Sequence, residues 1–356
     1  MTKVLLVGAG KIGSAILDLL GETGDYTVTV IDRSEPALSR LQSRARAVKA
    51  VDVSDESAVR AAMAGHDAVL SAAPFHLTQT VARAARAEGL HYFDLTEDRE
   101  SAHAIRDIAQ GAETTFAPQC GLAPGFISIV ANDLARGFTS LRNIYMRVGA
   151  LPQFPSNSLK YNLTWSTDGL INEYCNPCEA IYGGQRIEVL PLEGIETFAL
   201  DGDYSDAFNT SGGLGTLCDT YAGKVEDLNY KTVRYPGHRD MMRMLVRDLR
   251  LDLRRDLLRE ILEEAVPMTL QDVVLVFVTV SGEKDGRLMQ ETYAKKIYTT
   301  DRGAGTLSAI QLTTASGITA VLDMVVTGAL PDRGFLRQED VPLAGFLANR
   351  FGLHYA

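Results

Sequence analysis

Carboxylates that could take part in proton transfer stand close together at residues 94–98 of this 356-residue chain. Two acidic side chains this near each other repel, and the repulsion raises one pKa toward neutrality, as a general base requires. We therefore predict Asp94 and Glu97 as the catalytic residues. His76 and His91 are the alternative bases, and Asp98 is better explained as the N-cap of a following helix.

Two further polar patches are candidates for substrate binding. Glu173 and Tyr174 follow the single tryptophan of the chain at helix-like spacing, and Glu173 could hold a positively charged group. His238 and Arg239 follow a Tyr-Pro-Gly turn that would aim the next helix N-terminus, which together with a guanidinium could bind an anion. The simpler interpretations are an interface helix for the first patch and a capping turn for the second.

A glycine-rich turn near the N-terminus is the most informative motif. Gly8, Gly10 and Gly13 follow a short apolar strand and open a helix, and Asp32 stands 19 residues after Gly13. This spacing is typical of a dinucleotide site, in which the glycines allow a tight turn, close approach to a pyrophosphate and close packing of helix on strand. The predicted cofactor-binding residues are Gly8, Gly10, Lys11, Ile12, Gly13, Asp32, Arg33, Asp52, Val53, Ala72, Ala73 and Pro74.

The choice between NAD and NADP depends on two neighbouring residues. Asp32 favours NAD, because its carboxylate can accept hydrogen bonds from ribose hydroxyls and repels a 2′-phosphate. Arg33 favours NADP, since a guanidinium could hold that phosphate. We predict NAD, with NADP as the less favoured cofactor. Asp52 has a second interpretation as a helix cap, and Pro74 one as a strand terminator.

The first third of the chain alternates strands with helices. The predicted strands are 3–7, 26–31, 47–51, 68–72, 92–95 and 114–117, and the predicted helices are 12–20, 35–43, 56–64, 77–88 and 99–110. This alternation indicates parallel βαβ units in a doubly wound, Rossmann-type sheet, whose ligands bind at the carboxyl edge of the strands. The fold class is therefore α/β for this part.

The rest of the chain lacks this regular alternation of strands and helices, and it indicates a second α+β domain on a mixed or antiparallel sheet. Helices are predicted at 127–135, 239–264 (as one helix or two) and 316–328, and strands at 144–149, 273–282, 295–298 and 306–313. We place the first domain at residues 1–125, completed by about 315–356, and the substrate and dimerisation domain at 126–314. The apolar strand from Val273 to Val280 is expected to take part in a homodimer contact.

Composition narrows the classes of partner. The net charge is −10 and the sequence pI about 5.2, a surface that repels nucleic-acid phosphates and anionic lipid. We expect no nucleic acid, no membrane and no metal, and a cytoplasmic location, since the N-terminus lacks the pattern of a signal peptide and the four cysteines fit a reducing compartment.

The order of these motifs resembles the saccharopine dehydrogenase family. The resemblance rests on the glycine turn, the strand end 71–75, and the segments 92–97, 121–125, 165–174 and 232–238. It implies oxidation of a C–N bond in an amino acid with a nicotinamide cofactor, by a homodimer. Within the family, the length and the 234–238 stretch look most like members that oxidise the 6-amino group of L-lysine. The alternatives are a saccharopine-type reaction and a non-catalytic dinucleotide sensor.

Overall fold

The computed structural model describes residues 1–301 and 306–356, and the chain divides into two compact units. The first unit comprises Met1–Phe126 and Gln311–Ala356, and the second comprises Ile127–Ile310. The sequence placed these boundaries at residue 125 and near residue 315.

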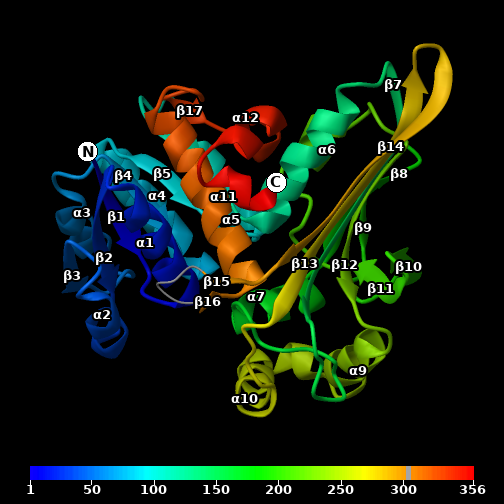
Figure 1. Cartoon of the computed structure of the whole chain (residues 1–356), viewed down its shortest axis with the longest axis horizontal. Coiled ribbons are helices and arrows are strands. Elements are labelled where there is room, and N and C mark those ends of the chain that lie inside the picture. The colour runs from blue at the N-terminus through cyan, green and yellow to red at the C-terminus, as the bar shows by residue number, and fades with distance from the viewer. Residues whose placement is uncertain (302–305) are drawn as a thin grey trace. The chain divides into compact units, whose positions relative to one another are not determined.

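The first unit is built on a seven-stranded parallel sheet in the order β17-β6-β5-β4-β1-β2-β3 (Figure 1). Its strands are β1 (Thr2–Val7), β2 (Tyr26–Asp32), β3 (Ala47–Ala50), β4 (Ala68–Ser71), β5 (His91–Asp94), β6 (Thr115–Ala117) and β17 (Gly334–Phe335). Its helices are α1 (Lys11–Thr23), α2 (Glu35–Leu41), α3 (Glu56–Met63), α4 (Thr78–Glu88), α5 (Arg99–Ile108), α11 (Ala309–Val326) and α12 (Leu343–Ala348). The predicted doubly wound α/β fold is confirmed.

Helix α11 is buried on nearly every side, although it carries polar residues such as Asp323. It is the one helix of the described residues that is long and apolar enough to cross a membrane, and 89% of that window is buried inside the protein. It packs so closely that a Cβ on Gly317 would lie 2.4 Å from the backbone oxygen of Cys120. This burial is that of a core helix.

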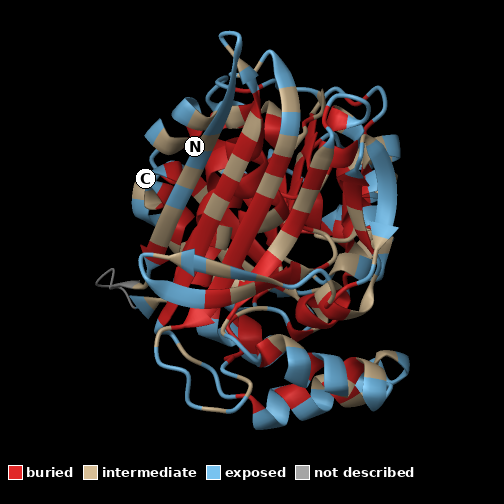
Figure 2. Cartoon of the chain, turned by 90° about the vertical axis from the view of Figure 1, so that its right-hand side faces the viewer, coloured by how far each residue is buried: buried red, intermediate tan, exposed pale blue. Residues whose placement is uncertain are grey.

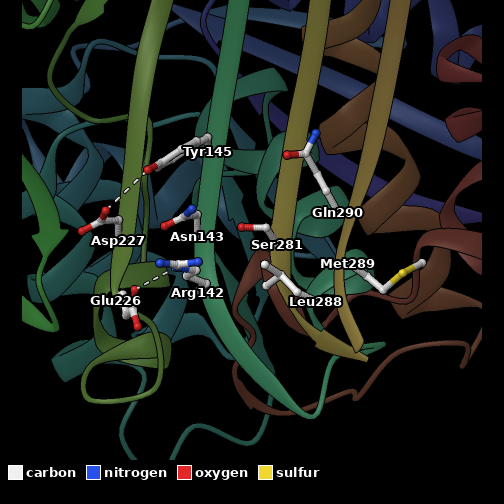
Figure 3. Close-up of a pocket in the computed structure, with 9 residues that line it drawn as sticks. All are labelled: Arg142, Asn143, Tyr145, Glu226, Asp227, Ser281, Leu288, Met289 and Gln290. Carbon is white, nitrogen blue, oxygen red and sulfur yellow. Dashed lines mark hydrogen bonds and ion pairs between the residues drawn. The ribbon is translucent and has the colours of Figure 1, made fainter. Parts of the chain in front are cut away.

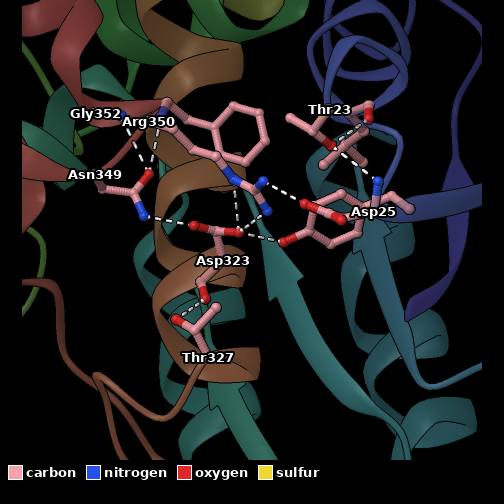
Figure 4. A network of polar contacts seen from close by, with 10 residues as sticks. Thr23, Asp25, Asp323, Thr327, Asn349, Arg350 and Gly352 are labelled. Atoms are coloured by element: carbon pink, nitrogen blue, oxygen red, sulfur yellow. Dashed lines mark hydrogen bonds and ion pairs between the residues drawn. The ribbon is translucent and has the colours of Figure 1, made fainter. Parts of the chain in front are cut away.

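A polar network ties the C-terminal segment to this unit (Figure 4). The buried Asp323 carboxylate accepts hydrogen bonds from the Tyr26 hydroxyl at 2.6 Å, the Asn349 amide at 2.7 Å and the Arg350 guanidinium at 2.6 Å. Arg350 also pairs with Asp25. Strand β2, helix α11 and the C-terminus are thereby held through one carboxylate, whose charge is compensated in place.

The second unit is built on an eight-stranded mixed sheet whose main path is β10-β11-β12-β7-β13-β14. Its strands are β7 (Ser140–Pro152), β8 (Cys178–Tyr182), β9 (Gln185–Val189), β10 (Glu196–Leu200), β11 (Asp203–Asn209), β12 (Asp227–Arg234), β13 (Asp272–Lys284) and β14 (Arg287–Tyr298). Its helices are α6 (Ile127–Ala135), α7 (Thr167–Cys175), α8 (Leu217–Tyr221), α9 (His238–Arg243) and α10 (Arg255–Ala265). The predicted second domain with a mixed sheet is confirmed.

The two faces of this sheet differ. Helix α6 packs against β7 and β13 on one face. Successive side chains of a strand point to opposite faces, and the alternation of buried and less buried residues along β13 shows that the second face is less covered. Figure 2 shows such alternation as red and tan bands along the strands. A shallow hollow of about 540 Å³ opens at β7, β13 and β14 (Figure 3).

One expectation for this part was wrong in detail. Residues 306–313 form a strand only at β16 (Thr306–Leu307), which pairs with β15 (Thr300–Asp301), and α11 begins at Ala309. Residues 239–264 contain two α-helices, as one interpretation of this segment expected, since α9 ends at Arg243 and α10 begins at Arg255. The apolar strand Val273–Val280 lies inside the sheet between β7 and β14, and its part in a homodimer contact stays a prediction.

Candidate functional site

The glycine turn joins β1 to α1 at the carboxyl edge of the parallel sheet. Gly8 has a φ of +109°, and a Cβ there would lie 2.9 Å from the backbone oxygen of Ala72. A Cβ on Gly13 would lie 2.0 Å from the backbone oxygen of Gly8. The fold itself therefore requires glycine at both positions, because no side-chain movement relieves a clash with backbone.

Gly10 has no such internal reason to be glycine. Its φ of −76° is open to any residue, and nothing lies within 4 Å of where its Cβ would be. The space beside Gly10, at the start of α1, is where a dinucleotide pyrophosphate would approach the backbone. Lys11 and Ile12, also predicted at this turn, open α1 as exposed and half-buried residues. The turn therefore fits a dinucleotide.

We expect the two glycines to respond differently to alanine. Gly10→Ala should leave the free energy of unfolding within about 0.5 kcal/mol of wild type, since it meets only open space, and should weaken dinucleotide binding roughly tenfold or more. Gly13→Ala should lower stability by about 1–3 kcal/mol because of its backbone clash. Urea unfolding and NADH fluorescence titration separate the effects, and a Gly10→Ala variant that binds NADH normally would contradict this role.

Asp32 lies at the end of β2 and shapes the turn directly. Its carboxylate accepts hydrogen bonds from the Ala9 amide at 2.7 Å and the Ser34 amide at 2.8 Å. Each oxygen keeps a further lone pair, so a ribose diol can still bind. Arg33 is exposed and lies close enough to Asp52 to help lower the pKa of that carboxyl, after the hydrogen bonds from Ser54.

The remaining predicted cofactor residues divide into two kinds. Asp52 does not cap α3, since the cap is Asp55, which accepts hydrogen bonds from the amides of Ser57 and Ala58. The Val53 side chain packs in the apolar core, so only its backbone could face a ligand. At the end of β4, Ala72 and Ala73 are half-buried and Pro74 is exposed, lying just before a short 3₁₀ turn (Phe75–Leu77).

The Asp94 carboxylate holds neighbouring backbone in place, whereas the sequence pattern predicted it to be catalytic. It is fully buried, and its oxygens accept hydrogen bonds from the Tyr92 hydroxyl at 2.7 Å, the Thr96 amide at 2.9 Å and the Gln119 amide at 2.8 Å. Burial raises the pKa of Asp94 to about 6, against the effect of these bonds. Gln119 has a φ of +66°, a strained conformation for a side chain other than glycine, and Asp94 holds it there.

The neighbours of Asp94 have separate roles. Asp98 caps α5 by accepting a hydrogen bond from the Ser101 amide at 2.8 Å, which confirms the simpler interpretation. Glu97 is half-buried on the same loop and stays a predicted site residue. His91 begins β5, at the opposite edge of the sheet from the glycine turn, and its Nδ1 accepts a hydrogen bond from the Thr115 amide.

A buried ionic cluster in the second unit joins α7 to the end of β12. The Arg234 guanidinium, 3% exposed, lies 3.6 Å from a Glu173 oxygen and donates to the Tyr174 hydroxyl at 3.0 Å. Its cation also lies 5.1 Å from the centre of the Tyr161 ring. Sequence reasoning missed Arg234, although it lies in the 232–238 segment, because nothing local shows that its side chain faces α7.

The hydrogen-bond directions in this cluster follow from its chemistry. His238 Nδ1 lies 2.7 Å from the Leu159 carbonyl, which can only accept, so Nδ1 carries the proton. Nε2 then accepts from the Tyr174 hydroxyl at 2.9 Å, and that hydroxyl accepts from Arg234. Burial and the nearby cation lower the pKa of His238 to about 3, so the ring is neutral.

Glu173 is the acidic residue of this cluster. Its side chain is 14% exposed, and its buried Oε2 atom makes no hydrogen bond and faces the Arg234 guanidinium at 3.6 Å. Burial raises the pKa of Glu173 to about 7, and the Arg234 charge limits the rise. A carboxylate with this pKa can accept a proton near neutral pH, or hold an ammonium group.

In this structure the polar groups of His238 and Arg239, the predicted anion site, are engaged within the fold. Both ring nitrogens of His238 are engaged and the side chain is fully buried. The Arg239 guanidinium bonds to the Leu192 carbonyl, to Glu193 at 3.0 Å and to Asp240 at 2.8 Å, so its charge is used within the fold. Tyr174 is likewise fully buried, which makes it a support for Glu173 rather than a substrate contact.

Several other buried side chains of the second unit have a polar atom without a hydrogen-bond partner. Among the described residues of the second unit, the buried side-chain atoms without a partner are Asn162 Oδ1, Thr164 Oγ1, Asn172 Nδ2, Glu173 Oε2 and Thr210 Oγ1. They come from α7, the segment before it and the end of β11. Buried polar groups without a hydrogen-bond partner are costly, so these atoms are candidates for contact with a polar ligand.

Comparison with known proteins agrees with the two-part organisation. Two family models match in succession, the saccharopine dehydrogenase NADP binding domain over residues 4–116 and the saccharopine dehydrogenase C-terminal domain over residues 121–352. Saccharopine dehydrogenase (NADP(+), L-glutamate-forming) of Schizosaccharomyces pombe is 24% identical over 208 residues, covering 55% of this chain and 46% of that protein. The alignment thus spans less than half the length of this curated relative.

Solved structures show the same fold at low sequence identity. Apo saccharopine dehydrogenase (L-Glu forming) from Saccharomyces cerevisiae matches with a TM-score of 0.78 at 18% identity, covering 95% of this chain and 94% of that one. Homospermidine synthase from Legionella pneumophila in complex with NAD matches with a TM-score of 0.68 at 14% identity, covering 99% and 89%. With both family models matched across its length, the chain belongs to the saccharopine dehydrogenase family and begins with that family's nicotinamide-dinucleotide-binding domain.

Proposed function

We propose that this protein is an NAD-dependent oxidoreductase of the lysine 6-dehydrogenase type, which oxidises the distal amino group of an L-amino acid, namely L-lysine. The observation that carries the proposal is Glu173, a carboxylate with a pKa of about 7 whose buried Oε2 atom makes no hydrogen bond and faces the Arg234 cation at 3.6 Å. The first unit is assigned to the cofactor and the second to the substrate.

The proposed chemistry begins with a proton. A protonated amine has no lone pair to form a C=N bond, so the substrate ammonium must first lose a proton, which Glu173 accepts. A bound nicotinamide supplies the acceptor for the hydride that leaves the same carbon. Water then attacks the resulting iminium carbon and ammonia leaves, giving an aldehyde. That aldehyde cyclises with the α-amine of the same molecule to a six-membered imine.

In this proposal the side chains around Glu173 keep its carboxylate partly ionised and fixed in position. Arg234 limits the rise of the Glu173 pKa, so the carboxylate is partly ionised at neutral pH. Tyr174 and His238 fix the guanidinium by bonding to one another and to the chain at Leu159. The substrate carboxylate requires hydrogen-bond donors, and the unpaired Asn172 amide and the Thr164 and Thr210 hydroxyls supply them in this proposal.

A saccharopine-type reaction is the alternative, favoured by the names of the curated relatives. Saccharopine carries an additional dicarboxylate arm, which calls for further cations. The least exposed arginines of the described second unit, Arg147, Arg234 and Arg239, already face the carboxylates of Glu196, Glu173 and Glu193. Opening such pairs to bind a substrate carboxylate is costly, so we favour the smaller diamino substrate.

A substrate panel tests this proposal. Purified protein is incubated with NAD and L-lysine, L-ornithine, saccharopine or unrelated amines, and NADH formation is followed by absorbance. We expect L-lysine to react fastest and its product to form an adduct with aminobenzaldehyde. Faster turnover of saccharopine would favour the alternative. No turnover with tight NADH binding would favour a dinucleotide sensor.

The proposed preference for NAD rests on Asp32, despite the NADP in the name of the matching family model. A 2′-phosphate would lie against the Asp32 carboxylate, which would repel it. The exposed Arg33 lies close enough to Asp52 to help lower the pKa of that carboxyl. Asp32→Ala should therefore raise the KM for NAD and lower that for NADP, narrowing the preference roughly tenfold or more. Strong selectivity of the wild type for NADP would contradict this assignment.

The remaining assignments concern the cellular context. We propose a cytoplasmic homodimer that acts on a small amino acid, with neither nucleic acid nor membrane as partner. The net charge of −10 supports the exclusion of nucleic acid and membrane as partners, since it disfavours binding to anionic polymers and lipid surfaces.

A further inference from the structure

Strand β14 leaves a long edge of the second sheet open. It has 12 residues without proline or glycine, and it is the last strand on the sheet path, paired with β13 along its whole length. Among the described residues no strand pairs with its outer side. Natural sheets protect such edges with short strands, prolines, bulges or free charges, because an open edge invites pairing with another chain.

The turn that starts β14 reveals which backbone groups face outward. Asp285 and Gly286 have φ values of 53° and 71°, and they join Lys284 to Arg287. Two such residues form a type I′ hairpin turn, whose flanking residues bond to each other. Arg287 therefore bonds inward to β13, and along an antiparallel ladder the direction alternates. The amide and carbonyl groups of the even-numbered residues from 288 to 298 then face the open edge.

The sequence of β14 complements itself in one register. We propose that β14 pairs antiparallel with β14 of a second copy of this chain, about a two-fold axis at Tyr293, as the homodimer contact. This register joins the outward-facing even residues, as the ladder requires. It places Glu291 opposite Lys295, Met289 opposite Ile297, and Leu288 opposite Tyr298, each pair occurring twice by symmetry.

Neighbouring registers lose these matches. Moving the axis to residue 292 sets Met289 against Lys295 and Leu288 against Lys296, and moving it to residue 294 sets Glu291 against Ile297. Moving the axis to residue 294 also shortens the overlap of the two strands. The charge and apolar patterns thus favour the same axis.

The exposure of the strand agrees with this contact. Leu288, Met289 and Tyr298 are 69%, 43% and 51% exposed, so apolar groups stand at both ends of the proposed pairing. Lys296 does not protect the edge, because its amine is held by Asp203 at 3.0 Å and Asp201 at 3.2 Å. The hollow in Figure 3 includes Leu288 and Met289, and a second strand laid along β14 would narrow it.

A proline substitution tests the pairing through the backbone. Thr292→Pro removes an amide that faces outward and leaves the bonds to β13 in place. By sedimentation velocity at micromolar concentration, we expect wild type and the control Thr292→Val to be dimers and Thr292→Pro to be a monomer with the wild-type circular dichroism spectrum. A monomeric wild type, or a dimeric and folded Thr292→Pro, would overturn the proposal.

Charge reversal gives a second test that does not depend on tolerating proline. Glu291→Lys and Lys295→Glu each place like charges together twice, so each variant alone should dimerise about tenfold more weakly or worse. Glu291 also pairs with Lys284 of its own hairpin, so Lys295→Glu is the variant that changes only the proposed contact. Mixed together, the two variants restore both opposite-charge pairs, and native mass spectrometry should show the heterodimer in excess over either homodimer. Homodimers as stable as wild type, or no preference for the heterodimer, would place the contact elsewhere.

Discussion

Glu173→Gln should lower kcat/KM for the amino-acid substrate by about 10²–10⁴-fold, the range expected when a general base is removed. The substitution keeps the shape of the side chain and removes its ability to accept a proton. Because the pKa of Glu173 is about 7 and the ionised form is the active one, wild-type kcat/KM should rise with pH to a plateau above that value. The variant should lose this rise.

The matched control is an acidic residue on the same helix. Asp168 also lies on α7, where it pairs with Arg259 at 3.2 Å and is 41% exposed. Asp168→Asn should retain most of the activity, and NADH titration should show that both variants bind cofactor like wild type. An unchanged pH profile in Glu173→Gln would remove Glu173 from the mechanism.

Arg234→Met should lower the free energy of unfolding by about 3–5 kcal/mol, because it leaves the buried Glu173 carboxylate without its cation and the Tyr174 hydroxyl without its donor. In protein that remains folded, the pKa of Glu173 should rise above 7, since the Arg234 charge now lowers it. The rise of kcat/KM with pH should move upward accordingly.

An exposed arginine of the same sheet provides the comparison. Arg142 pairs with Glu226 at 3.4 Å, with both side chains more than half exposed. Arg142→Met should change the free energy of unfolding by about 0–1 kcal/mol in urea titrations. If the two variants were equally stable, the buried cluster would not depend on its cation.

The first unit could be predicted closely from sequence because each of its elements carries its own local signal. The apolar runs ending at Val7 and Ile31 are bounded by glycine or polar turns, and helices such as α3 bury one stripe. The same reasoning failed at residues 306–313. There Gln311, Leu312 and Thr313 are all buried in a helix that is enclosed on every side, so no helical period appears in the sequence.

The residues of the candidate site also divide into those with a local sequence signal and those whose role depends on partners distant in sequence. The glycine turn and Asp32 could be recognised because their spacing along the chain is itself the signal. Glu173 could be singled out as an acidic residue, but its pKa depends on Arg234, which is distant in sequence. Arg239 was misjudged because its partner Glu193 lies on another loop, and only the folded chain brings the two together.

Isotope labelling tests the central claim most directly, since it identifies the carbon that loses its hydride. L-lysine carrying deuterium at C6, and separately at C2, is incubated with the enzyme and NAD, and the reduced cofactor is analysed by mass spectrometry. We predict deuterium in the cofactor from the C6-labelled substrate alone, with a product that aminobenzaldehyde traps. Deuterium arriving from C2, or no reduction of the cofactor by either lysine, would contradict the account.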